Sequence, residues 1–470
     1  MSSADAAWLH MDQPTNLMVV TAALWFDESV DWGRVREVVR ARLVERFPRF
    51  RQLVVEGRPP LSGPHWEEDP NFDIDLHLHR VALPDPGDRA ALQEFVSDLM
   101  ATPLDRSKPL WQFHFVDGYG DGAAIVARLH HCIADGVALA RVLLSLTDEE
   151  PDVGIAPPVE SKADDGHRGP LGALVQPAAD ALGAARGAAT GLAHEAIEVV
   201  RHPSELIDLA AAARDDVTAL AKVLLAGAEP ATPLKGDLGV AQRVAWSAPI
   251  PLDEVKTMGH ATGTTVNDVL LTAVAGALRR YLRAHDALVD ELTAIVPFNL
   301  RPLDEPLPVE LGNRFGLVFL HLPIGIGDRR RRLREIHRRM LEIKDSPEGA
   351  LSYGMLEAMG RTPVQLEERL IDLFSSRGTA VMTNVPGPQQ PVYLAGTEIR
   401  GVLVWAPCSG GVSMSVSIFS YAGEVTIGLM VHAGLVPDPE PIVSGFEKEV
   451  EALLRLKRNG NEATRRRQGA

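Results

Sequence analysis

Residues 130–136 read His130-His131-Cys132-Ile133-Ala134-Asp135-Gly136, and this stretch decides how the chain around it folds. The aromatic residues before it alternate at 111, 113 and 115, which predicts a strand. A turn rich in glycine and aspartate over 117–122 then leads back into a second strand over 123–129. Leucines and valines at helical spacing over 137–146 predict a helix after it. The stretch is therefore a strand-to-helix connection that carries two histidines and an aspartate.

The spacing HHxxxDG indicates acyl transfer by general-base catalysis. Successive side chains of a strand point to opposite faces, so His130 and His131 cannot both address one ligand. One of them is structural. An exposed imidazole in this turn, with an ordinary pKa of about 6.5, is largely neutral at cytoplasmic pH and could take the proton of an attacking alcohol or amine. Asp135 stands at the N-cap position of the next helix, and Gly136 lets a substrate or a second backbone segment approach closely.

A metal site is the main chemical alternative for this stretch, because histidine and aspartate are both metal ligands. Adjacent histidines that face opposite ways suit chelation poorly, and neither an HExxH nor a CxxC motif accompanies them. We therefore expect no metal. The sequence also contains no GxSxG nucleophile elbow and no Walker loop.

The composition is that of an ordinary globular protein, with 46% hydrophobic and 23% charged residues over 470 positions, which is enough for two or three domains. A net charge of -16 argues against nucleic acid as a partner, because neutralising phosphates needs a basic excess. Two cysteines, Cys132 and Cys408, do not make a disulfide framework, which favours a reducing cytoplasm. The first ten residues lack the pattern of a secretion signal, and no apolar run reaches the roughly 18 residues of a membrane span.

Strand and helix signals mix in two parts of the chain, 1–150 and 239–470. The part between them, 151–238, combines a linker rich in proline and acidic residues with alanine-rich helices. The patterns predict strands over 19–26, 73–79, 242–248, 292–297 and 315–322, a hairpin of 412–418 with 425–431, and helices over 32–47, 251–261 and 266–282. We expect an α+β pair of domains, not a doubly wound nucleotide fold.

Three further sequence blocks narrow this interpretation. HHxxxDG resembles the signature of the chloramphenicol acetyltransferase-like superfamily of CoA-dependent acyltransferases and peptide-synthetase condensation domains. Pro109-Leu110-Trp111, Asn267-Asp268 and Thr383-Asn384-Val385-Pro386-Gly387-Pro388 are similar, in the same order, to elements of the bacterial wax ester synthase/diacylglycerol acyltransferase family. The resemblance covers nearly the whole chain.

This resemblance implies two chloramphenicol-acetyltransferase-like domains, here 1–150 and 239–470, with mixed sheets flanking a central channel. Acyl-CoA and an acceptor alcohol would meet there at His131, the general base, while His130 would support the loop. Asp135 would be structural and paired with an arginine, for which Arg301 is our candidate. No cofactor is implied, since acyl-CoA is a co-substrate.

The other blocks carry supporting roles under the same resemblance. Asn267 would orient a substrate or the tetrahedral oxyanion, or Asn267 or Asp268 would cap the apolar helix. We interpret Trp111 first as core packing, because it belongs to the alternating strand. The block 383–388, which contains Asn384, is interpreted first as a rigid turn and second as part of the channel wall.

The expected function is esterification of a lipid alcohol by acyl-CoA, which converts diacylglycerol to triacylglycerol, a fatty alcohol to a wax ester, or both. The alternative is a condensation-like member of the superfamily that forms amides, or a member that only binds partners.

Residues 328–344 predict an amphipathic helix, with arginines on one side and Leu333, Ile336, Met340 and Ile343 on the other. This helix could lie on anionic lipid, meet CoA phosphates, or pack as a domain helix with a solvated basic face. Because long-chain acyl substrates partition into lipid, we expect a cytoplasmic protein associated peripherally with the inner face of the membrane or with lipid droplets.

Overall fold

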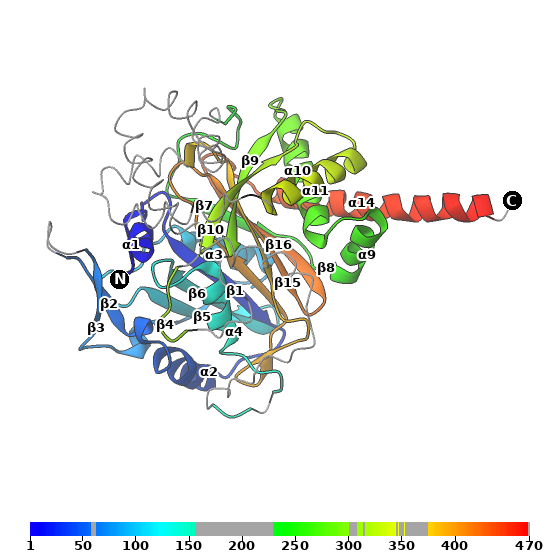
Figure 1. The fold of residues 1–470 in the computed structure, drawn as a ribbon. Coiled ribbons are helices and arrows are strands. Elements are labelled where there is room, and N and C mark those ends of the chain that lie inside the picture. The colour runs from blue at the N-terminus through cyan, green and yellow to red at the C-terminus, as the bar shows by residue number, and fades with distance from the viewer. Residues whose placement is uncertain are drawn as a thin grey trace, which may run out of the picture.

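Two large β-sheets organise the protein. The computed structural model describes residues 1–57, 63–151, 153–155, 229–299, 308–313, 315–344, 346, 352 and 375–468. Figure 1 shows the first part of the chain, blue to cyan, around one sheet and the later part, green to red, around the other. The expectations for most of 151–238 lie outside the described residues.

The first sheet has, within the described ranges, the strand order β14 (Gly401–Trp405), β1 (Val19–Phe26), β6 (Gly122–His130), β5 (Trp111–Tyr119) and β4 (Leu78–Ala82). Only β4 and β5 run parallel. The strands predicted over 19–26, 111–115 and 123–129 are confirmed.

The strand predicted over 73–79 is wrong at its start. Ile74–Leu76 forms a 3-10 turn, and β4 begins only at Leu78. The reason is local, because the carboxylate of Asp73 accepts a hydrogen bond of 3.0 Å from the backbone N–H of Asp75 and closes a turn.

The helices of the first part begin at side-chain caps. Ser2, Asp31 and Asp88 cap α1 (Ser3–His10), α2 (Trp32–Val39) and α3 (Arg89–Met100). A π-helical turn, Arg40–Val44, continues α2, so the helix predicted over 32–47 is confirmed through 44.

The second sheet has the order β10 (Phe315–Leu322), β9 (Leu292–Asn299), β11 (Ala380–Pro386), β15 (Met414–Tyr421), β16 (Glu424–His432) and β7 (Gln242–Trp246), with β8 (Ile250–Pro251) beside β16. Strand β11 runs parallel to both of its neighbours, and the other pairs are antiparallel. The remaining described strands form two small pairs, β2 (Gln52–Val55) with β3 (His65–Glu68) and β12 (Tyr393–Leu394) with β13 (Thr397–Glu398).

Helices cover one face of the second sheet. They are α9 (Leu252–Thr262), α10 (Val266–Ala284), α11 (Arg329–Lys344) and α14 (Glu440–Gln468), of which α14 runs away from the body in Figure 1. The apolar side chains of the alternating strand β15, such as Val416 and Ile418, share a buried core with Leu278 of α10 and Phe446 of α14.

A strand from the later part of the chain completes the first sheet. Strand β14 pairs with β1 from Thr21 opposite Trp405 to Trp25 opposite Gly401. Its other side contacts the second sheet, because the hydroxyls of Ser415 and Ser417 donate hydrogen bonds to backbone carbonyls at 406 and 404. The serine face of β15 thus meets β14, while its apolar face meets the helices.

Tryptophans fill the space between the two sheets. The ring of Trp246 lies 6.1 Å from that of Trp25 and 6.0 Å from that of Trp405. Two glycines leave room for these rings, since a Cβ atom would lie 2.1 Å from Trp25 at Gly401 and 2.8 Å from Trp405 at Gly428. One core therefore joins residues of both parts of the chain.

The α+β class with mixed sheets is confirmed, while the central channel and the domain boundaries remain predictions. No helix among the described residues is long and apolar enough to span a bilayer.

Replacing Trp405 by Ala should lower the free energy of unfolding by about 3–5 kcal/mol, because the fully buried ring fills the junction between the sheets. Urea denaturation measures this loss. Leu288→Ala, at a side chain that is 42% exposed, is the control and should change stability by less than about 0.5 kcal/mol. A Trp405→Ala protein as stable as the control would contradict the role given to this junction.

Candidate active site

The HHxxxDG stretch connects β6 to α4 (Gly136–Leu144), as the sequence predicts. Asp135 is the N-cap residue, and its Oδ1 accepts a 2.8 Å hydrogen bond from the backbone N–H of Ala138. Gly136 has open space where a Cβ atom would stand, so no second backbone segment of the described chain approaches it.

His130 is turned into the protein and holds the loop. Its Nδ1 accepts a hydrogen bond of 3.1 Å from the backbone N–H of Cys132, which leaves Nε2 facing a carboxylate oxygen of Asp12 at 3.7 Å. Burial raises the pKa of Asp12, but His130, the Met18 N–H and Arg106 outweigh it and lower that pKa to about 2. These contacts fit the predicted supporting role.

His131 is buried, which corrects the expectation of an exposed imidazole. Only 5% of the residue is accessible, because Trp8 of α1 and Phe315 of β10 cover the ring at centroid distances of 4.3 and 5.5 Å. Its Nδ1 has no hydrogen-bond partner among the described residues. Burial is the main cause that lowers the pKa of His131 to about 4, partly offset by Asn313 and by the charge of Asp5. The ring is therefore neutral, and able to accept a proton, at neutral pH.

A buried carboxylate holds the backbone of this turn through two other side chains. Asp5 accepts hydrogen bonds from Nη1 of Arg49 at 3.0 Å and from both the backbone N–H and Nδ2 of Asn313, at 3.0 and 2.9 Å. Nδ2 of Asn313 also donates to the carbonyl of His131 at 2.8 Å, and Arg49 donates to the carbonyls of Cys132 and Ile133 at 3.1 and 3.0 Å. Three consecutive carbonyls of the motif are thus bound by groups that Asp5 orients.

Helix α1 therefore acts on the motif in two ways. Asp5 and Trp8 stand three residues apart and so share a helix face, where one orients the turn and the other covers the imidazole. Sequence reasoning missed Asp5, Trp8, Arg49 and Asn313. The only available signal was the Ser2 cap of a short helix with Asp5 in its first turn, which does not reveal its partners.

Two of the other predicted blocks meet in space. Nδ2 of Asn384 donates a hydrogen bond of 2.9 Å to Oδ1 of Asn267, so any contact of Asn267 with an oxyanion would use its amide N–H groups. The turn expected over 383–388 is wrong for residues 383–386, because these residues continue β11 in parallel pairing with β15. Gly387 and Pro388 follow the strand, and the N–H of Gly387 donates a hydrogen bond to the carbonyl of Ser420.

The apolar helix begins earlier than the capping prediction requires. Thr265 is the N-cap residue of α10, and Asp268 occupies the third helical position, where its carboxylate accepts from the Thr265 N–H at 2.8 Å. The N-cap role expected for Asn267 or Asp268 is therefore wrong for both. Asp268 instead forms a capping box with Thr265, in which each side chain accepts a hydrogen bond from the backbone N–H of the other residue. Asp268 also contacts Nδ1 of His337 at 2.7 Å, which ties α10 to α11.

Trp111 is core, as interpreted, with no exposed surface and its indole N–H donating to the carbonyl of Phe50 at 2.8 Å. Arg301, the candidate partner of Asp135, lies outside the described residues. No group of three or more histidine, cysteine, aspartate or glutamate side chains in the described ranges could hold a metal ion.

Two family models match the chain. Residues 1–270 match the catalytic domain of wax ester synthase/diacylglycerol acyltransferase, and residues 311–454 match its C-terminal domain. The chain belongs to this family. It is an acyltransferase.

Relatives and solved structures agree with this assignment. A protein of Mycobacterium tuberculosis, provisionally named diacylglycerol O-acyltransferase, is 29% identical over 97% of this chain and 90% of its own length. One of Mycobacterium bovis is 29% identical over 87% of this chain and 84% of its own length.

The solved structures show the fold. The wax ester synthase/diacylglycerol acyltransferase of Marinobacter aquaeolei VT8 superposes with a TM-score of 0.68 at 23% identity, covering 96% of this chain and 98% of that one. The first condensation domain of the calcium-dependent antibiotic synthetase gives 0.59 at 14% identity, covering 97% and 96%.

Asn313→Ala should lower kcat about 10- to 100-fold with a smaller change in KM, because it frees the carbonyl of His131 and misplaces the imidazole. Steady-state kinetics with acyl-CoA and an acceptor alcohol measures both constants, and circular dichroism verifies folding. Asn71→Ala, at an exposed site, is the matched control. Wild-type kcat in a folded Asn313→Ala protein would contradict this role.

Proposed function

We propose that this acyltransferase uses acyl-CoA to esterify a lipid alcohol, either diacylglycerol, a fatty alcohol or both, with His131 as the general base. The observation that carries the proposal is the imidazole of His131, which lies buried beside the rings of Trp8 and Phe315 at the HHxxxDG turn and is kept neutral by that burial. The name of the family and the diacylglycerol O-acyltransferase names of the relatives support the lipid alcohol as acceptor.

In the proposed reaction His131 takes the proton of the acceptor hydroxyl as its oxygen attacks the thioester carbonyl. The tetrahedral oxyanion collapses, the carbon–sulfur bond breaks, and the CoA thiolate takes the proton from the imidazolium. No covalent acyl-enzyme is needed. Asp5 stabilises the imidazolium form of His131, because its negative charge favours the protonated ring, which burial disfavours.

The surroundings of His131 favour an apolar acceptor. Trp8, Phe315 and Cys132 belong to one buried hydrophobic cluster next to the imidazole. Exclusion of water from such a site protects the thioester from hydrolysis and strengthens the electrostatic effect of Asp5.

Peripheral association with the membrane or with lipid droplets also belongs to the proposal. The apolar side of α11 is not the surface that would contact the lipid. Leu333, Ile336 and Met340 are buried in the core of the second part of the chain. Of the three interpretations of 328–344, packing accounts for these side chains. Contact with anionic lipid would have to use the exposed arginines.

Product analysis with purified protein, palmitoyl-CoA and a panel of diacylglycerol, fatty alcohols and fatty amines tests the proposal. Ester and free CoA should form with the alcohols, and His131→Ala should abolish both while circular dichroism shows an intact fold. Amides as the main product would favour the condensation-like alternative. Ester formation by His131→Ala at most of the wild-type rate would refute the assignment of the base.

The pH dependence of kcat/KM tests the lowered pKa of His131. An imidazole with a pKa of 6.5 would lose roughly tenfold in its neutral form between about pH 7.5 and about pH 5.5, whereas one with a pKa of about 4 loses almost none. We therefore expect a nearly flat profile over this range. The folded fraction must be measured at each pH. A histidine buried neutral contributes stability above its unfolded pKa of about 6.5 that is lost as the pH falls toward 4, because the unfolded chain binds the proton first.

A further inference from the structure

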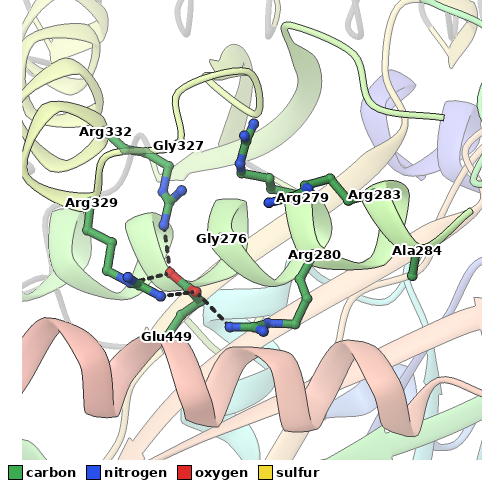
Figure 2. A pocket seen from close by; sticks show the side chains of 9 residues that line it. All are labelled: Gly276, Arg279, Arg280, Arg283, Ala284, Gly327, Arg329, Arg332 and Glu449. Carbon is green, nitrogen blue, oxygen red and sulfur yellow. Dashed lines mark hydrogen bonds and ion pairs between the residues drawn. The ribbon is translucent and has the colours of Figure 1, made fainter. Parts of the chain in front are cut away.

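A cavity of about 570 Å³ lies among α10, α11 and α14, and arginines dominate its lining (Figure 2). Helix α10 contributes Arg279, Arg280 and Arg283, and α11 contributes Arg329 and Arg332. Glu449 of α14 is the only acidic residue of the lining. The lining thus contains five guanidinium groups and one carboxylate, in a protein whose net charge is -16.

The single negative charge of Glu449 does not neutralise the five arginines. It accepts from Arg280, Arg329 and Arg332 at 3.1, 2.8 and 2.7 Å. Arg279 points to the backbone instead and donates to the carbonyls of residues 324 and 325 at 2.8 and 2.9 Å.

Arg283 is exposed at the cavity, and its guanidinium has no hydrogen bond or ion pair with another described residue. The lining keeps an excess of positive charge, which a bound anion would relieve.

Glycines allow the arginines to converge. A Cβ atom at Gly276 would lie 2.6 Å from both Arg332 and Glu449, and one at Gly327 would lie 3.2 Å from Arg279. Any side chain at Gly276 would displace the buried ion pair of Arg332 with Glu449. The absence of side chains at Gly276 and Gly327 therefore leaves room for the guanidinium groups.

The second sheet separates this cavity from His131. Helices α10 and α14 pack on the apolar face of β15, whereas the serine face of β15 meets β14, which belongs to the sheet that carries His130. The two places also lie at opposite ends of β10. Asn313 precedes this strand and binds the carbonyl of His131, whereas Gly327 follows its end. Eight residues of strand span about 25 Å.

We propose that this arginine cavity binds a phosphate-bearing ligand at a site separate from the one that contains His131. Guanidinium groups bind phosphate oxygens in bidentate pairs. Several guanidinium groups together match a ligand that carries more than one negative charge. A carboxylate carries only one, and Glu449 already supplies it. The phosphate can come from a soluble diphosphate or from the head group of an anionic phospholipid.

Isothermal titration of the full-length protein with pyrophosphate, and co-sedimentation with phosphatidylcholine vesicles with and without phosphatidylglycerol, test the proposal. We expect Arg283→Ala to weaken binding about tenfold or more, because it removes one charge-assisted contact. Arg283 is exposed, so the variant should keep the wild-type melting temperature. Arg334→Ala, which removes an exposed arginine of α11 outside the cavity, is the matched control and should bind like the wild type.

The two arms distinguish the sources. Binding of pyrophosphate that depends on Arg283 assigns a soluble ligand, and binding to phosphatidylglycerol vesicles alone, with the same dependence, assigns a lipid head group. The proposal is overturned if neither probe binds, or if Arg334→Ala weakens binding as much as Arg283→Ala. Both readouts are independent of acyl transfer, so they stand whatever the substrate of His131 is.

Discussion

The candidate active site depends on the hydrogen bonds and the ion pair that the carboxylate of Asp5 forms. It is fully buried, and a buried charge is tolerated only when it is paired and hydrogen-bonded, which Arg49 and Asn313 provide here. The same two side chains bind the carbonyls of residues 131–133. Loss of Arg49 would leave the negative charge of Asp5 buried without an ion-pair partner. The geometry of the turn is therefore linked to the stability of its surroundings.

This arrangement explains why His131 lies where the two sheets come together. The first sheet supplies the histidines at the end of β6, and the segment before β1 binds the N–H of His131 through the carbonyl of Met18 at 2.7 Å. The second sheet supplies Phe315 and, just before it, Asn313. Strand β14 and its tryptophan neighbours fix the two sheets against each other. A catalytic imidazole held from both sheets can be positioned more closely than one carried by a single loop.

Sequence patterns predict the parts of this structure that arise from local periodicity. The alternation over 111–115 and 412–418 and the N-cap role of Asp135 follow from rules that act over a few residues. The structure confirms them, with the second strand beginning at Met414. The burial of His131 could not be predicted this way. It depends on Trp8 and Phe315, which are far from it and from each other in sequence and meet it only in the folded chain. The error at Asp73 has a different cause, because one side-chain hydrogen bond closes a turn within the alternating pattern.

We infer that Asp5 positions the turn of His131 through Asn313, in addition to its contact with Arg49 and the effect of its charge on the imidazole. The contact between Asp5 and Asn313 spans 308 positions of the chain and forms only in the folded protein. A double-mutant cycle in kcat with Asp5→Ala and Asn313→Ala measures this coupling directly. If Asn313 transmits the effect, the double variant should be no slower than the slower single variant, with a coupling energy of about 1 kcal/mol or more. Effects on kcat that multiply independently would contradict the claim.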